Sequence, residues 1–167
     1  MNLIIDIRES KLISLYENNN INYEKKQLDL GDVQINNSNN TVLVFERKTL
    51  NDLLSSIVDG RYNEQSFRLD ACPVLNHNIY YIIEGDIERY KDKEKSLYTK
   101  NTIYSCIYSL TYKKGFSVLL SQNINQTYTL INKIYNKLCN EPVKSNEPVK
   151  SNENHENHEK KYLNSMK

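Results

Sequence analysis

The sequence contains no apolar stretch approaching the roughly 18 residues that a membrane-spanning helix requires. It also lacks the basic start and long apolar segment that mark a secreted protein, so we expect an intracellular chain with no membrane partner. The formal net charge is only +1, far from the strong positive charge of many nucleic-acid binders. A surface that binds phosphate therefore has to come from local groups of basic side chains.

Cysteine is scarce: Cys72, Cys106 and Cys139 are widely separated and form no Cys-x-x-Cys pattern. This spacing favours free thiols in a reducing compartment and argues against structural zinc. Asparagine, lysine, isoleucine and tyrosine are by contrast abundant, which suggests an AT-rich genome such as that of a large DNA virus or a parasite. The composition leaves both the nucleus and the cytoplasm as locations.

The chain divides into a domain at residues 1–139 and a tail at residues 140–167. Its 167 residues give room for one ordinary domain with a hydrophobic core. In the tail the hexapeptide Asn-Glu-Pro-Val-Lys-Ser occurs at 140–145 and again at 146–151, and Asn-His-Glu then follows twice. Polar, charge-balanced repeats cannot bury enough apolar surface to fold, so we predict that the tail is disordered.

Apolar patterns in the domain predict an α/β fold with a central mixed sheet flanked by helices. Short apolar runs predict strands at 3–5, 32–35, 41–45, 78–85 and 116–120. Helical spacing of apolar residues predicts helices at 10–18, 50–59, 61–72, 102–113 and 123–138. The apolar faces of the last two helices pack either onto the sheet of their own domain or against a second subunit.

The strand at 41–45 leads directly into Glu46, Arg47 and Lys48. Because side chains alternate faces along a strand, Glu46 and Lys48 lie on one face and Arg47 on the other. A hairpin with its turn midway between the two strands places Asp32 opposite Glu46, with Cβ atoms roughly 5 Å apart. A slip of the register by one residue instead puts the two carboxylates on opposite faces.

Two carboxylates at that spacing suit one shared divalent cation, since without it their like charges force a proton onto one of them. Mg²⁺ is typically held by one or two carboxylates together with phosphate oxygens and waters. Lys48 is then placed to orient or deprotonate a water, or to neutralise charge on a phosphate. The implied reaction is metal-assisted hydrolysis of a phosphodiester. The alternative for Glu46 and Lys48 is a salt-bridged strand end.

The helices after this strand carry further polar candidates. Asp52 lies three residues after Thr49, near the spacing of a capping box, which gives it a structural role. Arg61, Gln65 and Arg68 share one face of the next helix because they are spaced by three or four residues. Arg61 or Arg68 either holds a phosphate or forms an ion pair with a nearby carboxylate.

Taken together, these residues resemble the signature of a known family, the XPF/Mus-type structure-specific endonucleases. The excision-repair nuclease domain of this family belongs to the restriction-endonuclease-like superfamily. Within the family, the sequence most resembles the Mus-like, crossover-junction branch. The similar segments, in chain order, are 5–9, 31–32, 46–48, 52, 56–65, 68–69 and 81–85. They occur in the family's order and span most of residues 1–139.

The resemblance implies a restriction-endonuclease-like fold and a site that depends on Mg²⁺ or Mn²⁺. It also implies that a carboxylate at the start of the first helix joins Asp32 and Glu46 as a metal ligand. This residue is Glu9, with Asp6 as a second candidate for the metal or for support of its ligands. The helix dipole offers Glu9 an alternative, structural role.

The resemblance assigns supporting roles as well. The family counterpart of Asp52 supports the cluster of basic side chains at Arg47 and Lys48. We therefore expect Arg47 and Asp52 to tie the strand to the helix and to belong, with Lys48, to the catalytic set. The candidates for binding DNA phosphates are Arg8, Arg61 and Arg68.

The function implied by the resemblance is an endonuclease that cuts branched DNA, such as 3′ flaps, forks or nicked junctions, in DNA repair or recombination. Family members pair through the region of the last two helices, so 102–138 is the candidate interface of a homodimer or heterodimer. Two alternatives are a non-catalytic DNA-binding or scaffold subunit of a nuclease heterodimer, and a Holliday-junction resolvase on the same core. The tandem helix-hairpin-helix modules of many family members do not occur in this sequence.

Overall fold

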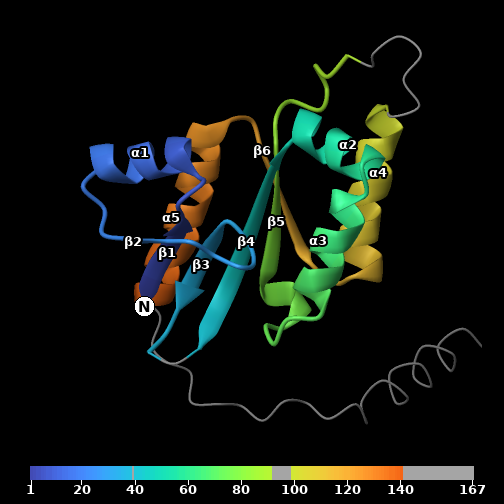
Figure 1. The fold of residues 1–167 in the computed structure, drawn as a ribbon. Helices are drawn as coiled ribbons and strands as arrows, with labels where there is room; N and C mark the ends of the chain where they lie inside the picture. The colour runs from blue at the N-terminus through green and yellow to red at the C-terminus, as the bar shows by residue number, and fades with distance from the viewer. Residues whose placement is uncertain (39, 92–98, 141–167) are drawn as a thin grey trace, which may run out of the picture.

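The computed structural model describes residues 1–38, 40–91 and 99–140, which form one mixed sheet with helices on both faces (Figure 1). Its strands are β1 (Asn2–Asp6), β2 (Glu24–Lys26), β3 (Val33–Asn36), β4 (Thr41–Thr49), β5 (Ile79–Glu84) and β6 (Ser117–Ser121). Its α-helices are α1 (Ser10–Asn18), α2 (Leu50–Val58), α3 (Arg61–Asp70), α4 (Lys100–Tyr108) and α5 (Ile124–Asn140). A 3-10 turn, η1 (Asn76–Asn78), precedes β5, and a π-helical turn, η2 (Ser109–Lys113), extends α4.

The strands lie side by side in the order β2-β1-β3-β4-β5-β6. β1 pairs with β2, β4 with β5 and β5 with β6 in parallel, whereas β3 is antiparallel to both of its neighbours. The predicted α/β fold with a central mixed sheet is therefore confirmed. The short edge strand β2 lies in a weakly alternating stretch that the apolar pattern did not identify as a strand.

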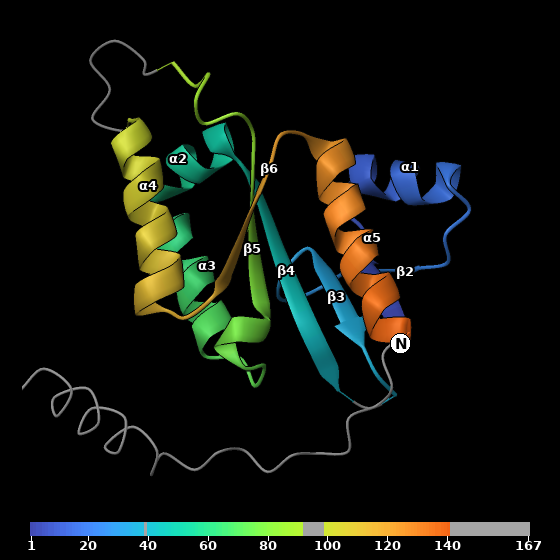
Figure 2. The same cartoon turned by 180° about the vertical axis from the view of Figure 1, so that it is seen from behind.

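The sheet separates two hydrophobic cores, because successive residues of a strand face opposite sides. Ile79, Tyr81 and Ile83 of β5 pack with α2, α3 and α4, while Ile82 faces the core that contains Ile131 of α5. Figure 2 shows α4 and α5 lying over the two different faces of the sheet. The inner apolar faces of both helices thus pack onto the domain's own sheet, which is one of the two alternatives that the sequence left open.

The β3–β4 hairpin has the predicted register, with Val33 opposite Phe45 and Ile35 opposite Leu43. Two details differ from the expectation. β3 begins at Val33, so Asp32 lies just before the paired segment, and β4 continues as a strand to Thr49 instead of ending before Glu46. β4 is longer because β5 pairs with it in parallel through this stretch and satisfies its backbone groups.

The predicted tail at 140–167 lies outside the described residues except for Asn140, and so do residues 92–98 of the charged segment after β5. All three cysteines carry free thiols, as their spacing indicated. Within the described parts of the chain, no helix has the length and apolar character needed to cross a membrane.

Candidate functional site

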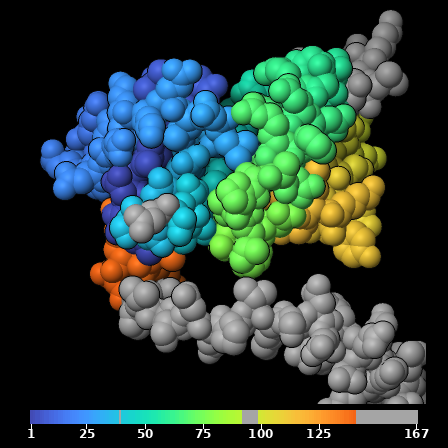
Figure 3. All heavy atoms as spheres, turned by 60° about the horizontal axis from the view of Figure 1, so that its bottom comes forward, coloured from blue at the N-terminus to red at the C-terminus, as the bar shows by residue number. Residues whose placement is uncertain are grey.

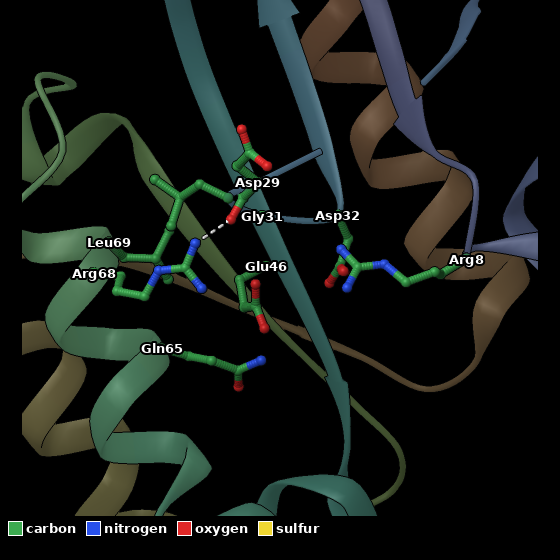
Figure 4. Close-up of a pocket in the computed structure, with 9 residues that line it drawn as sticks. Arg8, Asp29, Gly31, Asp32, Glu46, Gln65, Arg68 and Leu69 are labelled. Atoms are coloured by element: carbon green, nitrogen blue, oxygen red, sulfur yellow. Dashed lines mark hydrogen bonds between the residues drawn. The ribbon is translucent and has the colours of Figure 1, made fainter. Parts of the chain in front are cut away.

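A pocket lies where the segment before β3, the strand β4 and helix α3 meet, and Asp32 and Glu46 face it side by side (Figure 4). Arg8 and Gln65 extend towards the two carboxylates from different elements, the β1–α1 turn and α3. The residues that line the pocket are Arg8, Asp29, Leu30, Gly31, Asp32, Glu46, Gln65, Arg68 and Leu69. The sequence argument depended on the convergence of Asp32 with Glu46, and both side chains line this one pocket.

Asp32 is fixed by hydrogen bonds that replace ordinary strand pairing. Its N–H donates to the Phe45 carbonyl at 2.7 Å, and its Oδ2 accepts the backbone N–H of Arg47 at 2.7 Å. Gly31 allows the turn, with a φ of +73° that L side chains rarely adopt. The turn therefore aims the Asp32 carboxylate back at the strand that carries Glu46.

Glu46 and Lys48 lie on the same face of β4, as the alternation of a strand requires, and Lys48 Nζ donates to Glu46 Oε1 at 3.2 Å. The two residues are only 6% and 7% exposed. The predicted acid–amine pair is thus real and buried. Its salt bridge also matches the structural alternative, so the pair alone does not decide between the two readings.

Burial of the two carboxylates makes their charge costly. It raises the pKa of Glu46 to about 7, and the neighbouring Asp32 charge adds to the rise while the Lys48 ammonium opposes it. Burial likewise raises the pKa of Asp32, against the lowering effect of its hydrogen bond from Arg47. The positive charges of Lys48, Arg47 and Arg8 also lower the pKa of Asp32 but do not outweigh its burial, so a divalent cation here would favour the ionised carboxylates.

Arg47 lies on the opposite face of β4 and contacts a different set of acids. Its Nε and Nη2 donate to Glu84 at 3.1 and 3.4 Å, and its Nη1 lies 3.6 Å from Glu9 Oε2. Burial, followed by the charge of Asp32, raises the pKa of Glu9. Glu9 is therefore near the site electrostatically but is held by Arg47.

Asp6, the second candidate ligand, is already satisfied by protein donors. Arg8 donates to it through Nε at 2.6 Å and Nη2 at 3.0 Å, and the Leu28 N–H donates at 2.7 Å. Burial opposes its ionisation, but these hydrogen bonds outweigh burial and lower the pKa of Asp6. Asp6 thus anchors the Arg8 side chain beside the pocket.

The remaining candidates lie at the edge of the pocket or away from it. Arg68 lines the pocket and donates to the Asp29 carbonyl at 2.5 Å. In the space-filling view, the light-blue segment leading into β3 lies against green α3 (Figure 3). Arg61 pairs with Asp59 at 2.7 Å, the ion-pair alternative. Asp52 exchanges hydrogen bonds with Thr49 in the cap of α2 and is exposed.

The model of one protein family, the ERCC4 domain, matches residues 5–134 of this sequence. The chain belongs to the ERCC4 domain family. The resemblance to the XPF/Mus-type nucleases is therefore confirmed.

Relatives of this ERCC4 domain include the probable crossover junction endonuclease mus81 of Dictyostelium discoideum, 42% identical over 95 residues that cover 49% of this chain and 10% of the relative. The structure-specific endonuclease subunit MUS81 of Rattus norvegicus is 35% identical over 94 residues, which cover 51% of this chain and 17% of the relative. This chain therefore spans only a small part of the length of these proteins.

The solved structures of XPF from Aeropyrum pernix, alone and in complex with DNA, have the same fold. The free protein superposes with a TM-score of 0.67 at 23% identity, over 86% of this chain and 67% of that chain. The DNA complex gives 0.66 at 24% identity, over 86% and 68%. At this level of identity the likeness establishes the fold alone.

Four residues of this ERCC4 domain contribute to the site although the sequence gave them no role there. Gln65 was placed on the face of Arg68 by helical spacing, and its Oε1 is buried with no partner. Tyr81 lies opposite Glu46 in the β4–β5 pairing, with a buried and unpartnered hydroxyl. Glu84 and Thr127 act through Arg47. Glu84 lies in the similar segment 81–85, but neither residue had a signal for this role, because their partners are far away in the sequence.

The donors fit a magnesium ion of the kind that keeps several waters, but they do not form a closed cage. Among residues 1–38, 40–91 and 99–140, no three or more His, Cys, Asp or Glu side chains are grouped to hold a metal ion. The carboxylates of Glu9, Asp32 and Glu46 do not form one three-ligand group in the described residues, because Glu9 pairs with Arg47 instead. Asp32 and Glu46 supply two hard oxygen donors, which suffices when phosphate and water complete the shell.

Proposed function

We propose that this ERCC4 domain is a Mg²⁺- or Mn²⁺-dependent endonuclease that hydrolyses phosphodiesters of branched DNA, including 3′ flaps, forks and nicked junctions, in repair or recombination. The observation that carries the proposal is the pair of carboxylates, half-buried Asp32 and buried Glu46, beside the Lys48 ammonium in a pocket flanked by arginines. The names of the relatives support the class of reaction and substrate. A DNA substrate and free thiols fit a place in the nucleus or cytoplasm.

Each residue has a distinct chemical task in this proposal. Asp32 and Glu46 would hold the divalent ion, and Glu9 adds negative charge nearby. Such an ion supplies Lewis-acid charge and a more acidic water. Lys48, already hydrogen-bonded to Glu46, holds the attacking water or balances charge that develops on the phosphate. Arg68 and Arg8, which flank the pocket, bind neighbouring phosphates.

A non-catalytic scaffold subunit is the main rival, because degenerate partners occur in this family. Such partners usually lose the acidic residues, whereas this chain keeps Asp32 and Glu46 together in one pocket. A Holliday-junction resolvase on the same core differs in substrate alone. The rivals therefore differ in what the protein cuts, or whether it cuts at all.

We also propose that a second subunit, identical or related, binds at the outer side of α4 and the free edge of β6. Tyr104, Tyr108 and Tyr112 recur every four residues there, and are 46%, 54% and 76% exposed. β6 is the last strand of the sheet, and its Leu120 is 53% exposed. An unpaired strand edge beside exposed aromatic rings is a common basis for association. The interface lies within the predicted region 102–138 but uses outer surfaces.

The test of the function compares single-stranded, duplex, 3′-flap, forked, nicked-junction and four-way DNA in one gel assay, with Mg²⁺, Mn²⁺ or chelator. We expect cleavage of the flap, fork or nicked junction that requires either metal and stops with chelator. Binding of forked DNA without cleavage under either metal would support the scaffold subunit. Preferred cleavage of intact four-way DNA would support the resolvase.

A further inference from the structure

A buried hydroxyl links the last helix to the acids behind the site. Thr127, in the first turns of α5, is fully buried, and its hydroxyl donates to Glu84 Oε2 at 2.8 Å. The Ser121 hydroxyl at the end of β6, 2% exposed, lies 2.7 Å from that of Thr127. Figure 2 shows β6 leading directly into α5, so the strand and helix bring the two hydroxyls together.

The direction of these hydrogen bonds follows from the number of protons. A hydroxyl has one proton to donate, and an ionised carboxylate only accepts. Because the Thr127 proton goes to Glu84, the Ser121 hydroxyl has to donate to Thr127 Oγ1. The hydroxyls therefore form a one-way chain that ends on the Glu84 carboxylate.

The Glu84 carboxylate, held by Thr127, in turn binds the Arg47 guanidinium. Oε2 of Glu84 accepts from Arg47 Nε at 3.1 Å as well as from Thr127, while Oε1 accepts from Arg47 Nη2 at 3.4 Å. The third guanidinium nitrogen, Nη1, lies 3.6 Å from Glu9 Oε2. The backbone N–H of Arg47 meanwhile holds the Asp32 carboxylate. One residue thus joins the hydroxyl chain to two acids of the site.

The side chain of Glu84 is only 11% exposed, so few other donors are available to it. A buried carboxylate that loses one of its donors bears the cost of an unmet acceptor and becomes free to rotate. The planar fork of an arginine binds well only when the carboxylate is held in matching orientation. Loss of the Thr127 hydroxyl would therefore loosen Arg47 and, through it, the position of Glu9.

We propose that Thr127 is a positioning residue for the site. Its hydroxyl fixes Glu84, which holds the Arg47 guanidinium between Glu84 and Glu9, and so ties helix α5 to the acids that serve the reaction. This inference rests on the proposed nuclease function for its catalytic consequence. The contact geometry that it describes does not depend on that function.

The test uses the full chain with Thr127→Val, which keeps the shape and removes the hydroxyl, and Thr127→Ser, which keeps the hydroxyl. Ser56→Ala is the control, because Ser56 is also fully buried and donates one hydrogen bond, to Leu53 O at 2.7 Å, away from the site. Three quantities are measured: hydrogen exchange of the Arg47 Nε–H by NMR without metal, affinity for forked DNA, and single-turnover cleavage with saturating Mg²⁺.

For Thr127→Val we expect faster exchange at Arg47, unchanged DNA affinity and cleavage slowed by about tenfold, because misplaced groups lower the rate more than they lower binding. Thr127→Ser should restore both exchange and cleavage, and Ser56→Ala should lose stability without slowing cleavage. If Thr127→Val does not fold, Ser121→Ala takes its place and should give a weaker effect of the same kind.

Unchanged exchange at Arg47 in Thr127→Val would overturn the proposal, as would a cleavage rate equal to that of the wild type. Equal slowing in Thr127→Val and Ser56→Ala would also overturn it, since a general loss of stability would then explain both. If the wild type cuts no DNA at all, the proposed function fails. The exchange measurement still decides whether Thr127 positions Arg47.

Discussion

Glu46 combines burial, a like charge and an amine, and its behaviour as a single residue follows from that environment. Lys48 offsets only part of the cost of ionising it, because Asp32 and the low-dielectric surroundings act in the opposite direction. The carboxyl therefore keeps its proton to a much higher pH than an exposed glutamate. A residue of this kind destabilises the folded protein when it is charged and no cation is present.

We predict that the metal-free protein loses stability as pH rises from 5 to 8. The folded pKa of Glu46, about 7, lies above its ordinary value of 4.5, so the folded state binds more protons than the unfolded state between them. The stabilising contribution is complete below the ordinary value and is lost as pH passes through the folded pKa.

The measurement is the free energy of unfolding from urea titrations in chelator at pH 5, 6, 7 and 8, for the wild type and Glu46→Gln. The difference between wild type and variant should fall steadily across this range. A difference that stays constant, or rises with pH, would show that Glu46 is not the buried acid described.

The sequence located some of these residues and missed others for a clear reason. Asp32 and Glu46 were paired by counting outwards from the hairpin turn, a local rule that the observed register obeys. Glu84 and Thr127 could not be found in that way, because the hydrogen bond between them joins positions 43 residues apart. A threonine on a helix has no pattern that distinguishes a buried donor from an exposed side chain.

At the scale of elements, the turn before β3 matters most, since it aims Asp32 at β4. Gly31 adopts a φ of +73°, and a Cβ built on it would lie 2.5 Å from Val44 Cγ1 and 3.0 Å from the Phe45 carbonyl oxygen. Gly60, between α2 and α3, has a similar φ of +82°, but a Cβ there would meet nothing within 4 Å. A side chain at either glycine would therefore strain the backbone, but only a side chain at Gly31 would also collide with neighbouring atoms.

We predict that Gly31→Ala destabilises the protein more than Gly60→Ala does. Both variants bear the left-handed backbone penalty of about 1–2 kcal/mol. Only Gly31→Ala adds overpacking against β4, for about 1–3 kcal/mol more. Urea unfolding of the two variants measures the difference directly. Equal losses of stability would mean that the turn yields easily and does not fix Asp32.

Elements with strong local patterns were predicted well, and those that depend on a neighbour were not. The helix after Thr49 begins where the sequence indicated, because Thr49 accepts the Asp52 N–H in a cap. β4 was predicted to end before Glu46, since charged residues break the apolar run. It continues to Thr49 because β5 supplies parallel backbone partners, which a single strand's sequence does not reveal.

At the scale of the whole molecule, helices cover both faces of the sheet, and no strand among the described residues pairs with the outer edge of β6. The sequence could identify the apolar faces of the last two helices but not their partner, because the same pattern serves a sheet or a second subunit. In the structure, the inner apolar faces of α4 and α5 pack onto the sheet. The outer tyrosines of α4 were unpredicted, since tyrosine at helical spacing fits a core equally well.

We predict that association depends on this outer surface. The double variant Tyr108→Ser and Tyr112→Ser should shift the protein towards monomer, because it removes two mutually stacked rings with centroids 5.2 Å apart. Light scattering coupled to size-exclusion chromatography gives the mass. Phe67→Ser is the control, since Phe67 is 68% exposed on α3. An unchanged dimer in the double variant would place association at another surface. A wild type that is itself a monomer would contradict the proposed interface.

The most direct test of the central claim is metal-dependent cleavage of a DNA fork by the wild type, Asp32→Asn and Glu46→Gln. Asp70→Asn is the matched control, an acid of α3 whose contacts are with Asn76 and Lys114 outside the pocket. Both site variants should keep the fold by circular dichroism and the affinity for the fork, yet cut at least about a hundredfold more slowly, the scale of losing an essential charged group at a reaction centre. Asp70→Asn should cut like the wild type. Full cleavage by either Asp32→Asn or Glu46→Gln would contradict the account.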